Sequence, residues 1–197
     1  MKTYQVGGSV RDELLGVEPH DKDWVVVGSS PEEMIEAGFK PIGKDFPVFL
    51  HPDTKEEYAL ARTERKSGKG YHGFKFYYDP SVTLEDDLLR RDLTINAIAK
   101  DSQGKLIDPF NGQDDLFNKK LRNVSDAFCE DPLRAIRLGR FLSYKHISGF
   151  SITPQLKAIV KKILDSGELN YLSGDRVFAE IDKACLLYTS PSPRDKS

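Results

Sequence analysis

Two acidic side chains at alternate positions, Asp21 and Asp23, are the residues of this sequence best suited to chemistry. They lead into the apolar run Trp24–Val27, which is typical of a buried strand. Because side chains alternate along a strand, we expect both carboxylates on one face. Like charges held this close repel each other, and hard oxygen ligands at this spacing suit one or two Mg²⁺ ions. The pair therefore predicts a magnesium site with Glu57, on a later strand, as a candidate third ligand; the alternative is a pair of plain surface carboxylates.

A double glycine, Gly7–Gly8, lies just before this pair. We expect it to turn the chain into a short helix over Val10–Leu15, whose first backbone N–H groups would face a phosphate. Ser9 would cap this helix, in a capping-box pattern completed by Asp12. Arg11 would add a fixed positive charge near the positive end of the helix dipole. The stretch matches neither the P-loop nor the dinucleotide-binding pattern, and a double glycine alone indicates only a tight turn.

Three arginines recur at intervals of three residues in a segment that reads as a helix, Pro132–Lys145. Arg134, Arg137 and Arg140 would occupy one arc of about 120° on that helix. Apolar residues fill much of the remaining circumference, so we expect the helix to be buried. Buried arginines need anionic partners, which would be a bound ligand or, alternatively, nearby Asp and Glu side chains.

Two further charged clusters flank this region. Arg91 and Asp92 follow an acidic stretch, Glu85–Asp87, and taken alone this pattern indicates salt bridges at a helix end. Asp131 stands directly before Pro132, a combination that favours a helix N-cap followed by a first-turn proline.

The composition limits the class of protein. The 197 residues carry a formal net charge of −2, so overall charge does not indicate a nucleic-acid binder, and any RNA contact must come from local basic patches. No apolar run reaches the roughly 18 residues of a membrane helix. The two cysteines, Cys129 and Cys185, form no disulfide framework and fit a reducing compartment. We therefore expect a cytoplasmic protein that contacts no membrane.

The order of elements favours an α+β fold with a mixed or antiparallel sheet, followed by an all-helical unit. Strands are expected at Thr3–Val6, Asp21–Val27, Val48–Leu50, Glu57–Arg62, Thr94–Ala99 and Lys105–Ile107. Further helices are expected at Pro31–Ala37, Leu84–Arg91, Asp114–Lys120, Thr153–Ser166 and Gly174–Leu187. The basic, glycine-rich stretch Arg62–Gly73 is expected to be a mobile loop. We define the head as residues 1–123 and the neck as residues 124–186.

The last residues, 187–197, differ in composition from the rest of the chain. They are rich in serine and proline and break the helical pattern abruptly. They resemble the translated adapter read-through that sometimes ends assembled genes. We therefore expect a non-native or disordered tail and exclude it from fold reasoning.

Five motifs in order resemble the class II tRNA nucleotidyltransferases, the bacterial CCA-adding enzymes of the polymerase-β superfamily. The motifs are G-G-S-V-R-D, D-K-D-W-V-V-V-G, R-R-D-L-T-I-N-A, D-P-F-N-G and E-D-P-L-R-A-I-R-L-G-R. The resemblance runs from residue 1 to about residue 185. It implies a polymerase-β-like nucleotidyltransferase head followed by a helical neck. A final family motif falls at Ser173–Arg176 with Glu180 one turn later, and here Asp175 stands where glutamate is usual.

The resemblance also implies a role for each matching residue. Asp21 and Asp23 would be catalytic and hold Mg²⁺, and Gly8 and Arg11 would hold the triphosphate. Arg91 and Asp92 would meet the phosphates and a ribose hydroxyl. The base would be read by Asp131 and Arg134, and Arg137 and Arg140 would line the same pocket.

The implied activity is template-independent addition of C, C and A from CTP and ATP to the 3′ end of tRNA, with release of pyrophosphate. We expect a form that lacks the body and tail by which such enzymes grip tRNA, and we favour a monomer. A bacterial poly(A) polymerase and an inactive nucleotide-binding fragment are the alternatives.

Overall fold

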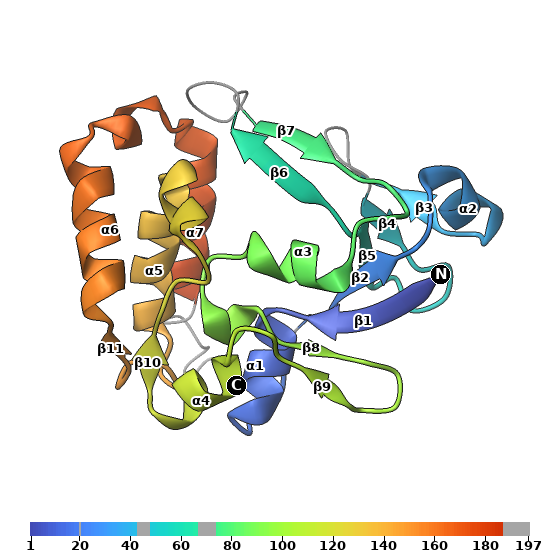
Figure 1. Cartoon of the computed structure of the whole chain (residues 1–197), viewed down its shortest axis with the longest axis horizontal. Helices are drawn as coiled ribbons and strands as arrows, with labels where there is room; N and C mark the ends of the chain where they lie inside the picture. Colours follow the sequence, from blue (N-terminus) through green and yellow to red (C-terminus); the bar gives the residue numbers. More distant parts are fainter. Residues whose placement is uncertain (20, 43–47, 67–73, 187–197) are drawn as a thin grey trace, which may run out of the picture.

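A mixed seven-stranded sheet is the largest element of the fold, in the order β3-β4-β5-β2-β1-β8-β9 (Figure 1). The structure is a computed structural model that describes residues 1–19, 21–42, 48–66 and 74–186. The strands are β1 (Lys2–Val6), β2 (Asp23–Val27), β3 (Lys40–Pro41), β4 (Val48–Leu50), β5 (Glu57–Leu60), β8 (Ala99–Lys100) and β9 (Leu106–Ile107). The expected α+β class with a mixed sheet is confirmed. The expected tail lies outside the described residues.

Strand β2 has neighbours that run in opposite directions. It pairs antiparallel with β1, where Asp23 faces Val6, and parallel with β5, where Asp23 faces Glu57. Strand β1 ends at Val6 because helix α1 (Gly8–Leu14) follows almost at once. Strand β2 therefore has partners only from Asp23 onward, and Asp21 precedes the strand. The expectation that the strand begins at Asp21 is wrong.

The start of α1 also differs from the expected cap. The helix begins after Gly7, whose φ of 74° is a conformation that favours glycine, and the carbonyl of Gly7 accepts from the backbone N–H of Arg11 at 3.2 Å. Ser9 lies inside the first turn, and its hydroxyl donates to the carbonyl of Val6 at 3.1 Å. The capping box of Ser9 and Asp12 is therefore wrong, because the glycine turn starts the helix before Ser9.

The expected strand Thr94–Ala99 is mostly wrong. Thr94–Asn96 form a 3₁₀ helix, and only β8 at its end joins the sheet. The backbone N–H of Thr94 donates to the carbonyl of Arg122 instead of to a strand. Ile95, Ala97 and Ile98 are all fully buried, so the apolar pattern carries no alternation that could separate a strand from a buried turn.

The expected loop Arg62–Gly73 is wrong over its first part. Strand β6 (Thr63–Lys66) pairs antiparallel with β7 (Phe74–Tyr77) in a separate two-stranded sheet. The remainder of that loop, 67–73, lies outside the described residues.

The helices follow the sequence pattern closely. Those of the head are α2 (Pro31–Glu36), α3 (Leu84–Leu89) and α4 (Gly112–Phe117), and those of the neck are α5 (Leu133–Ser143), α6 (Pro154–Asp165) and α7 (Gly174–Leu186). Ser30 and Thr83 form capping boxes at α2 and α3, and Thr153 caps α6. At α5 the N-cap residue is Pro132, so the expected Asp131 cap is wrong by one residue, although the Asp131 carboxylate still accepts from Leu133 N–H at 3.1 Å.

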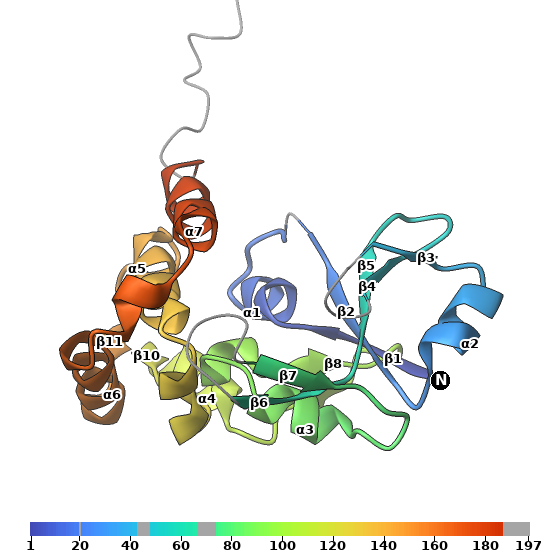
Figure 2. The same cartoon turned by 90° about the horizontal axis from the view of Figure 1, so that it is seen from above.

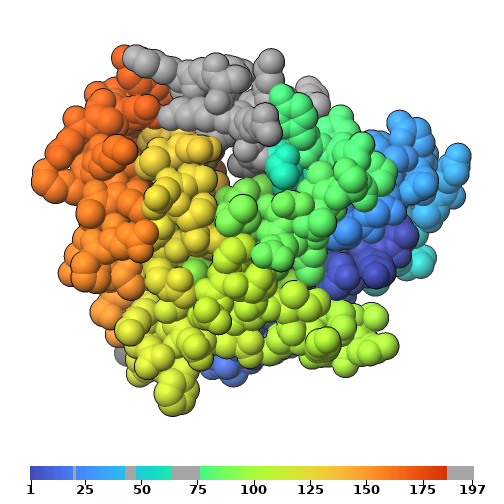
Figure 3. Space-filling model, in the orientation of Figure 1, coloured from blue at the N-terminus to red at the C-terminus, as the bar shows by residue number. Residues whose placement is uncertain are grey.

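Head and neck share one hydrophobic core. The three neck helices stand together at one end of the molecule, away from α2 and β3 (Figures 1 and 2). The largest buried cluster contains Leu93 and Ile95 of the head together with Phe128, Leu138 and Phe141 of the neck. In the space-filling view, α5 lies directly against the head (Figure 3). The division at residue 123 stays a prediction, but the two parts pack as one body.

The structure bears on the expectations about membrane helices and about the cysteines. Among the described residues, no helix is long and apolar enough to cross a membrane. Cys129 and Cys185 are both free thiols, the first half-buried and the second exposed.

Gly112 and Gly139 provide a matched test of packing. A Cβ at Gly112 would lie 2.3 Å from the carbonyl oxygen of Thr94, whereas one at Gly139 in α5 would meet nothing within 4 Å. We expect Gly112→Ala to lower the free energy of unfolding by about 2–3 kcal/mol through overpacking. Gly139→Ala should raise it by about 0.5–1 kcal/mol, because alanine restricts the unfolded chain. Urea unfolding measures both, and equal effects would contradict the tight approach of α4 to Thr94.

Candidate functional site

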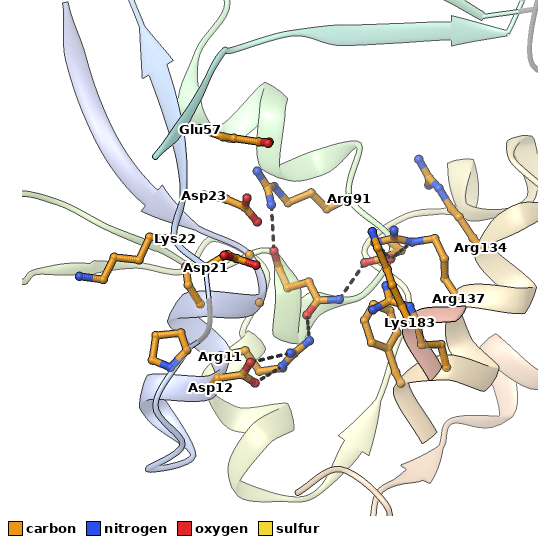
Figure 4. Close-up of a pocket in the computed structure, with 18 of the residues that line it drawn as sticks. Arg11, Asp12, Asp21, Lys22, Asp23, Glu57, Arg91, Arg134, Arg137 and Lys183 are labelled. Carbon is orange, nitrogen blue, oxygen red and sulfur yellow. Dashed lines mark hydrogen bonds and ion pairs between the residues drawn. The ribbon is translucent and has the colours of Figure 1, made fainter. Parts of the chain in front are cut away.

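A pocket of about 1410 Å³ lies where the head meets the neck (Figure 4). All ten site residues expected from the sequence line it: Gly8, Arg11, Asp21, Asp23, Arg91, Asp92, Asp131, Arg134, Arg137 and Arg140. They come from α1, the approach to β2, the end of α3 and the helix α5. The structure therefore brings together residues that are more than a hundred positions apart in the sequence.

The pocket has a charge opposite in sign to that of the whole chain. Of the described residues, eleven Arg and Lys side chains line it against seven Asp and Glu side chains. The complete sequence has a formal net charge of −2. An excess of positive groups within a concave wall favours binding of an anion, because such walls focus the electrostatic potential.

The two candidate metal ligands lie on one side of the pocket. The carboxylates of Asp21 and Asp23 lie near each other, with Arg91 close by (Figure 4). Burial raises the pKa of Asp23 above its ordinary value, the charge of Asp21 raises it further, and Arg91 opposes both. Two like charges that destabilise each other fit a divalent cation, whose charge would remove the repulsion.

Glu57, the candidate third ligand, lies opposite Asp23 on β5 and also lines the pocket. Even so, no group of three His, Cys, Asp or Glu side chains among the described residues is arranged to hold a metal ion. The donor set that the structure brings together is therefore the pair Asp21 and Asp23.

The double glycine allows a close approach to the charged groups. A Cβ at Gly7 would lie 3.0 Å from Nη1 of Arg91 and 3.9 Å from Oδ2 of Asp23. A Cβ at Gly8 would lie 3.3 Å from Nη2 of Arg11. Side chains at either position would fill the space between the carboxylates and the arginines, so glycine keeps this part of the pocket open.

Arg91 forms an ion pair with a buried acid of α3, Asp87. Asp87 in α3 is completely buried and accepts from Arg91 at 3.1 Å and from Arg90 at 2.9 Å. Burial opposes the ionisation of Asp87, but the two arginines outweigh it and hold the pKa of this carboxyl below its ordinary value. Nε of Arg91 is buried without a hydrogen-bond partner among the described residues.

A chain of ion pairs connects the head to two neck helices. Asp92 in the head accepts from Nε of Arg137 in α5 at 2.9 Å. Burial opposes its ionisation, yet Arg137 and the amide of Asn96 outweigh burial and hold the pKa of Asp92 well below its usual range. Glu180 in α7 then accepts from Arg137 at 3.3 Å and from Arg140 at 2.5 Å. Arg137 and Arg140 therefore have carboxylate partners within the protein, which was the alternative to a bound ligand.

The two candidate base readers lie at the neck side of the pocket. Asp131 accepts from Arg176 of α7 at 2.9 Å, which fixes the direction of its carboxylate. Arg134 is mostly buried and donates to the carbonyls of Ala127 at 3.2 Å and Arg90 at 2.6 Å. Both side chains are thus oriented by contacts with other elements before any ligand binds.

Sequence reasoning missed several residues of the site. Asn96 connects Arg11 to Asp92, and His146 contacts Asp12. Nothing in the local pattern indicates the contact of Asn96 with Arg11 or that of His146 with Asp12, because these partners are 85 and 134 positions apart in the sequence. Lys183 also lines the pocket, and it could have been found from its position seven residues after Arg176, on the same face of α7.

A comparison with protein families decides which group this chain resembles. A family model described as "Poly A polymerase head domain" matches residues 3–122, more than half of the chain. The chain belongs to this head-domain family. The resemblance to the class II tRNA nucleotidyltransferases is confirmed as well, because the relatives carry the names of CCA-adding enzymes.

Three relatives illustrate the similarity. The CCA-adding enzyme of Marinobacter nauticus is 60% identical over 184 residues, which cover 93% of this chain and 49% of that protein. The structure of the Bacillus stearothermophilus CCA-adding enzyme in complex with CTP matches with a TM-score of 0.74 at 30% identity, over 92% of this chain and 44% of that one. The Thermotoga maritima CCA-adding enzyme complexed with tRNA matches with a TM-score of 0.69 at 30% identity, over 93% and 42%. The chain spans about half the length of the curated relatives it matches.

The raised pKa of Asp23 predicts how the stability of the fold depends on pH. An acid with a higher pKa in the folded than in the unfolded state binds more protons when folded, so stability falls as the pH rises between the two pKa values. Asp23→Asn removes the carboxylate charge whose pKa is raised. We expect the variant to be more stable than the unaltered protein at pH 7.5, and this gain to disappear at pH 3.5.

Urea unfolding in the absence of divalent cations measures this difference across the pH range. Asp165→Asn, which alters an exposed acid of α6, is the matched control and should show no such gain. A gain of the same size at both pH values would contradict a charge effect at Asp23.

Proposed function

We propose that this chain is the head and neck of a tRNA nucleotidyltransferase that adds C, C and A, from CTP and ATP, to the 3′ end of tRNA with release of pyrophosphate. The observation that carries the proposal is one cavity lined by a carboxylate pair, by arginines suited to phosphates and by the pair Asp131 and Arg134. Its volume, about 1410 Å³, exceeds the roughly 300–1,000 Å³ of a pocket for one small molecule. The space is sufficient for a nucleoside triphosphate beside the end of an acceptor strand.

Divalent metal ions are generally required by polymerase-β-type nucleotidyltransferases, and here Asp21 and Asp23 would hold Mg²⁺. The cation would lower the pKa of the attacking 3′ hydroxyl and neutralise charge on the α-phosphate. Around it, Arg11 and Arg91 bind the triphosphate and orient it in line with the acceptor hydroxyl. Gly8 leaves room for the phosphates beside Arg11.

Protein side chains would replace a nucleic-acid template in choosing the base. Cytosine and adenine each offer an amino donor beside a ring-nitrogen acceptor, whereas uracil and guanine offer a carbonyl beside an N–H. An acceptor on Asp131 and a donor on Arg134 match the first pattern and clash with the second. Arg176 and Leu133 N–H hold the Asp131 carboxylate in one orientation, as such discrimination requires.

The partners in this proposal are CTP, ATP and the 3′ end of tRNA. Firm binding of a whole tRNA depends on phosphate neutralisation over a large surface, so the head and neck would contribute mainly to the contacts at the 3′ end. Monomeric state and cytoplasmic location stay predictions.

The carboxylate pair supplies the first test. We expect the double variant Asp21→Ala, Asp23→Ala to lose at least about 10³-fold in nucleotide addition, because several kcal/mol of transition-state stabilisation disappear with the cation site. The assay follows radiolabelled CTP and ATP on a tRNA that ends at the discriminator base, with Asp165→Asn as the control. Unchanged addition by the double variant would contradict the proposed function.

Base selection supplies the second test. Asp131→Ala and Arg134→Ala should lose discrimination against UTP and GTP by about 10²-fold or more, because the polar mismatch that rejects a wrong base disappears. Single-turnover incorporation of each of the four nucleotides measures this ratio. Full selectivity in both variants would contradict the base-reading roles of Asp131 and Arg134.

The unaltered protein distinguishes the alternative functions. Incorporation of ATP alone would indicate a poly(A) polymerase, and nucleotide binding without incorporation would indicate an inactive fragment.

A further inference from the structure

Arg11, the candidate triphosphate ligand of the head, is held in place by residues of both the neck and the head. Its guanidinium carbon lies 5.6 Å from the ring centre of Phe141 and 5.5 Å from that of Tyr144, both at the end of α5. Contacts of this kind stabilise a cation. The neck therefore contributes to the position of Arg11.

Within the head, Arg11 is oriented by hydrogen bonds. Nε and Nη2 donate to the two oxygens of Asp12 at 2.8 and 3.0 Å, and Nη1 donates to Oδ1 of Asn96 at 2.7 Å. These contacts use three of the five N–H donors of a guanidinium. The remaining two lie at nitrogens that border the pocket, beside the open space at Gly8.

His146 adds to the support of Arg11 by contacting Oδ1 of Asp12, the same oxygen that accepts from Nε of Arg11. It follows α5 in the neck, 134 positions from Asp12, and its Nε2 lies 3.0 Å from Oδ1 of Asp12. Because an ionised carboxylate only accepts hydrogen bonds, Nε2 of His146 is the protonated nitrogen. The imidazole also stacks on Tyr144, with ring centres 5.5 Å apart and planes 29° apart. His146 thus joins the Asp12 carboxylate to an aromatic ring that contacts Arg11.

We propose that His146 is a positioning residue for nucleotide binding: it fixes Asp12, and Asp12 directs the two remaining donors of Arg11 toward the phosphates. The inference rests on the proposed function, because it assigns Arg11 to the triphosphate. His146 itself does not line the pocket among the described residues, so it acts through Asp12 and Arg11 rather than by contact with the nucleotide.

Two substitutions separate the hydrogen bond of His146 from its ring contact. His146→Phe keeps a ring on Tyr144 but removes the donor to Asp12, whereas His146→Gln keeps a donor near the place of Nε2 but removes the ring. We expect His146→Phe to raise the Kd for CTP about fivefold, because loss of one hydrogen bond has an effect of this size. The Kd of His146→Gln should stay within about twofold of that of the unaltered protein. The Kd for CMP should change little in either variant, because CMP lacks the outer phosphates.

A mutant cycle shows whether the effect passes through Arg11. Titration calorimetry with CTP and CMP compares the unaltered protein, Arg11→Ala, His146→Phe and the double variant. If His146 acts through Arg11, His146→Phe adds no further loss once Arg11 is absent. In steady-state addition of CTP, His146→Phe should raise KM and leave kcat within about twofold.

The outcomes separate this inference from the proposed function. If Arg11→Ala raises the Kd for CTP but His146→Phe leaves it unchanged, the role of His146 is overturned while that of Arg11 stands. The same conclusion follows if the two increases in Kd multiply in the double variant. An unchanged Kd in Arg11→Ala removes the phosphate role of Arg11 and the inference with it. If His146→Phe does not fold, as judged by its urea midpoint, Asp12→Asn tests the same contact from the head and should raise the Kd for CTP but not for CMP.

Discussion

The ion pair between the buried Asp92 and the half-buried Arg137 is the interaction on which the arrangement of head and neck depends. Burying a charge costs free energy that its partner restores only when the remaining lone pairs are satisfied. Here Leu93 N–H and the amide of Asn96 supply those bonds to Asp92, and Glu180 supplies a second partner to Arg137. Loss of Arg137 would leave the charge of Asp92 buried without its counterion, at a cost of about 3–5 kcal/mol. The pair therefore specifies one orientation of the neck against the shared hydrophobic core.

The same ion pair belongs to a closed series of contacts around the pocket. In order the members are Asp92, Asn96, Arg11, Asp12, His146, Tyr144, Arg140, Glu180 and Arg137, with a ring stack between His146 and Tyr144 and hydrogen bonds elsewhere. Four members belong to the head and five to the neck. Because the contacts that join the two parts also orient Arg11, Arg137 and Arg140, the pocket is organised by the same interactions that hold the fold.

The sequence predicts the elements and the membership of the site better than it predicts the contacts. Helices such as α2 and α6 carry their signals locally, in Ser30 and Thr153 and the apolar pattern that follows. The segment from Thr94 is different, because uniform burial removes the alternation that would show its conformation. The contact of Asp12 with His146 could not be predicted, since its residues are 134 positions apart and only the tertiary fold brings them together. The ten residues expected at the site nevertheless line one pocket, and they stand in short, mostly charged motifs that are visible without a fold.

The carboxylates of Asp21 and Asp23 repel each other, whereas the charges of the ion-pair network attract each other. Each acid of the network has cationic or amide partners, and the pKa of Asp92 is accordingly lowered. The pKa of Asp23 is raised, because desolvation by the walls of the pocket, together with the charge of Asp21, outweighs the attraction of Arg91. The fold leaves this pair in mutual repulsion beside a network whose acids have partners, so unfavourable energy is held at one place. Binding of a cation would release that energy, and the network would provide the rigidity that keeps Asp23 and Asp21 together.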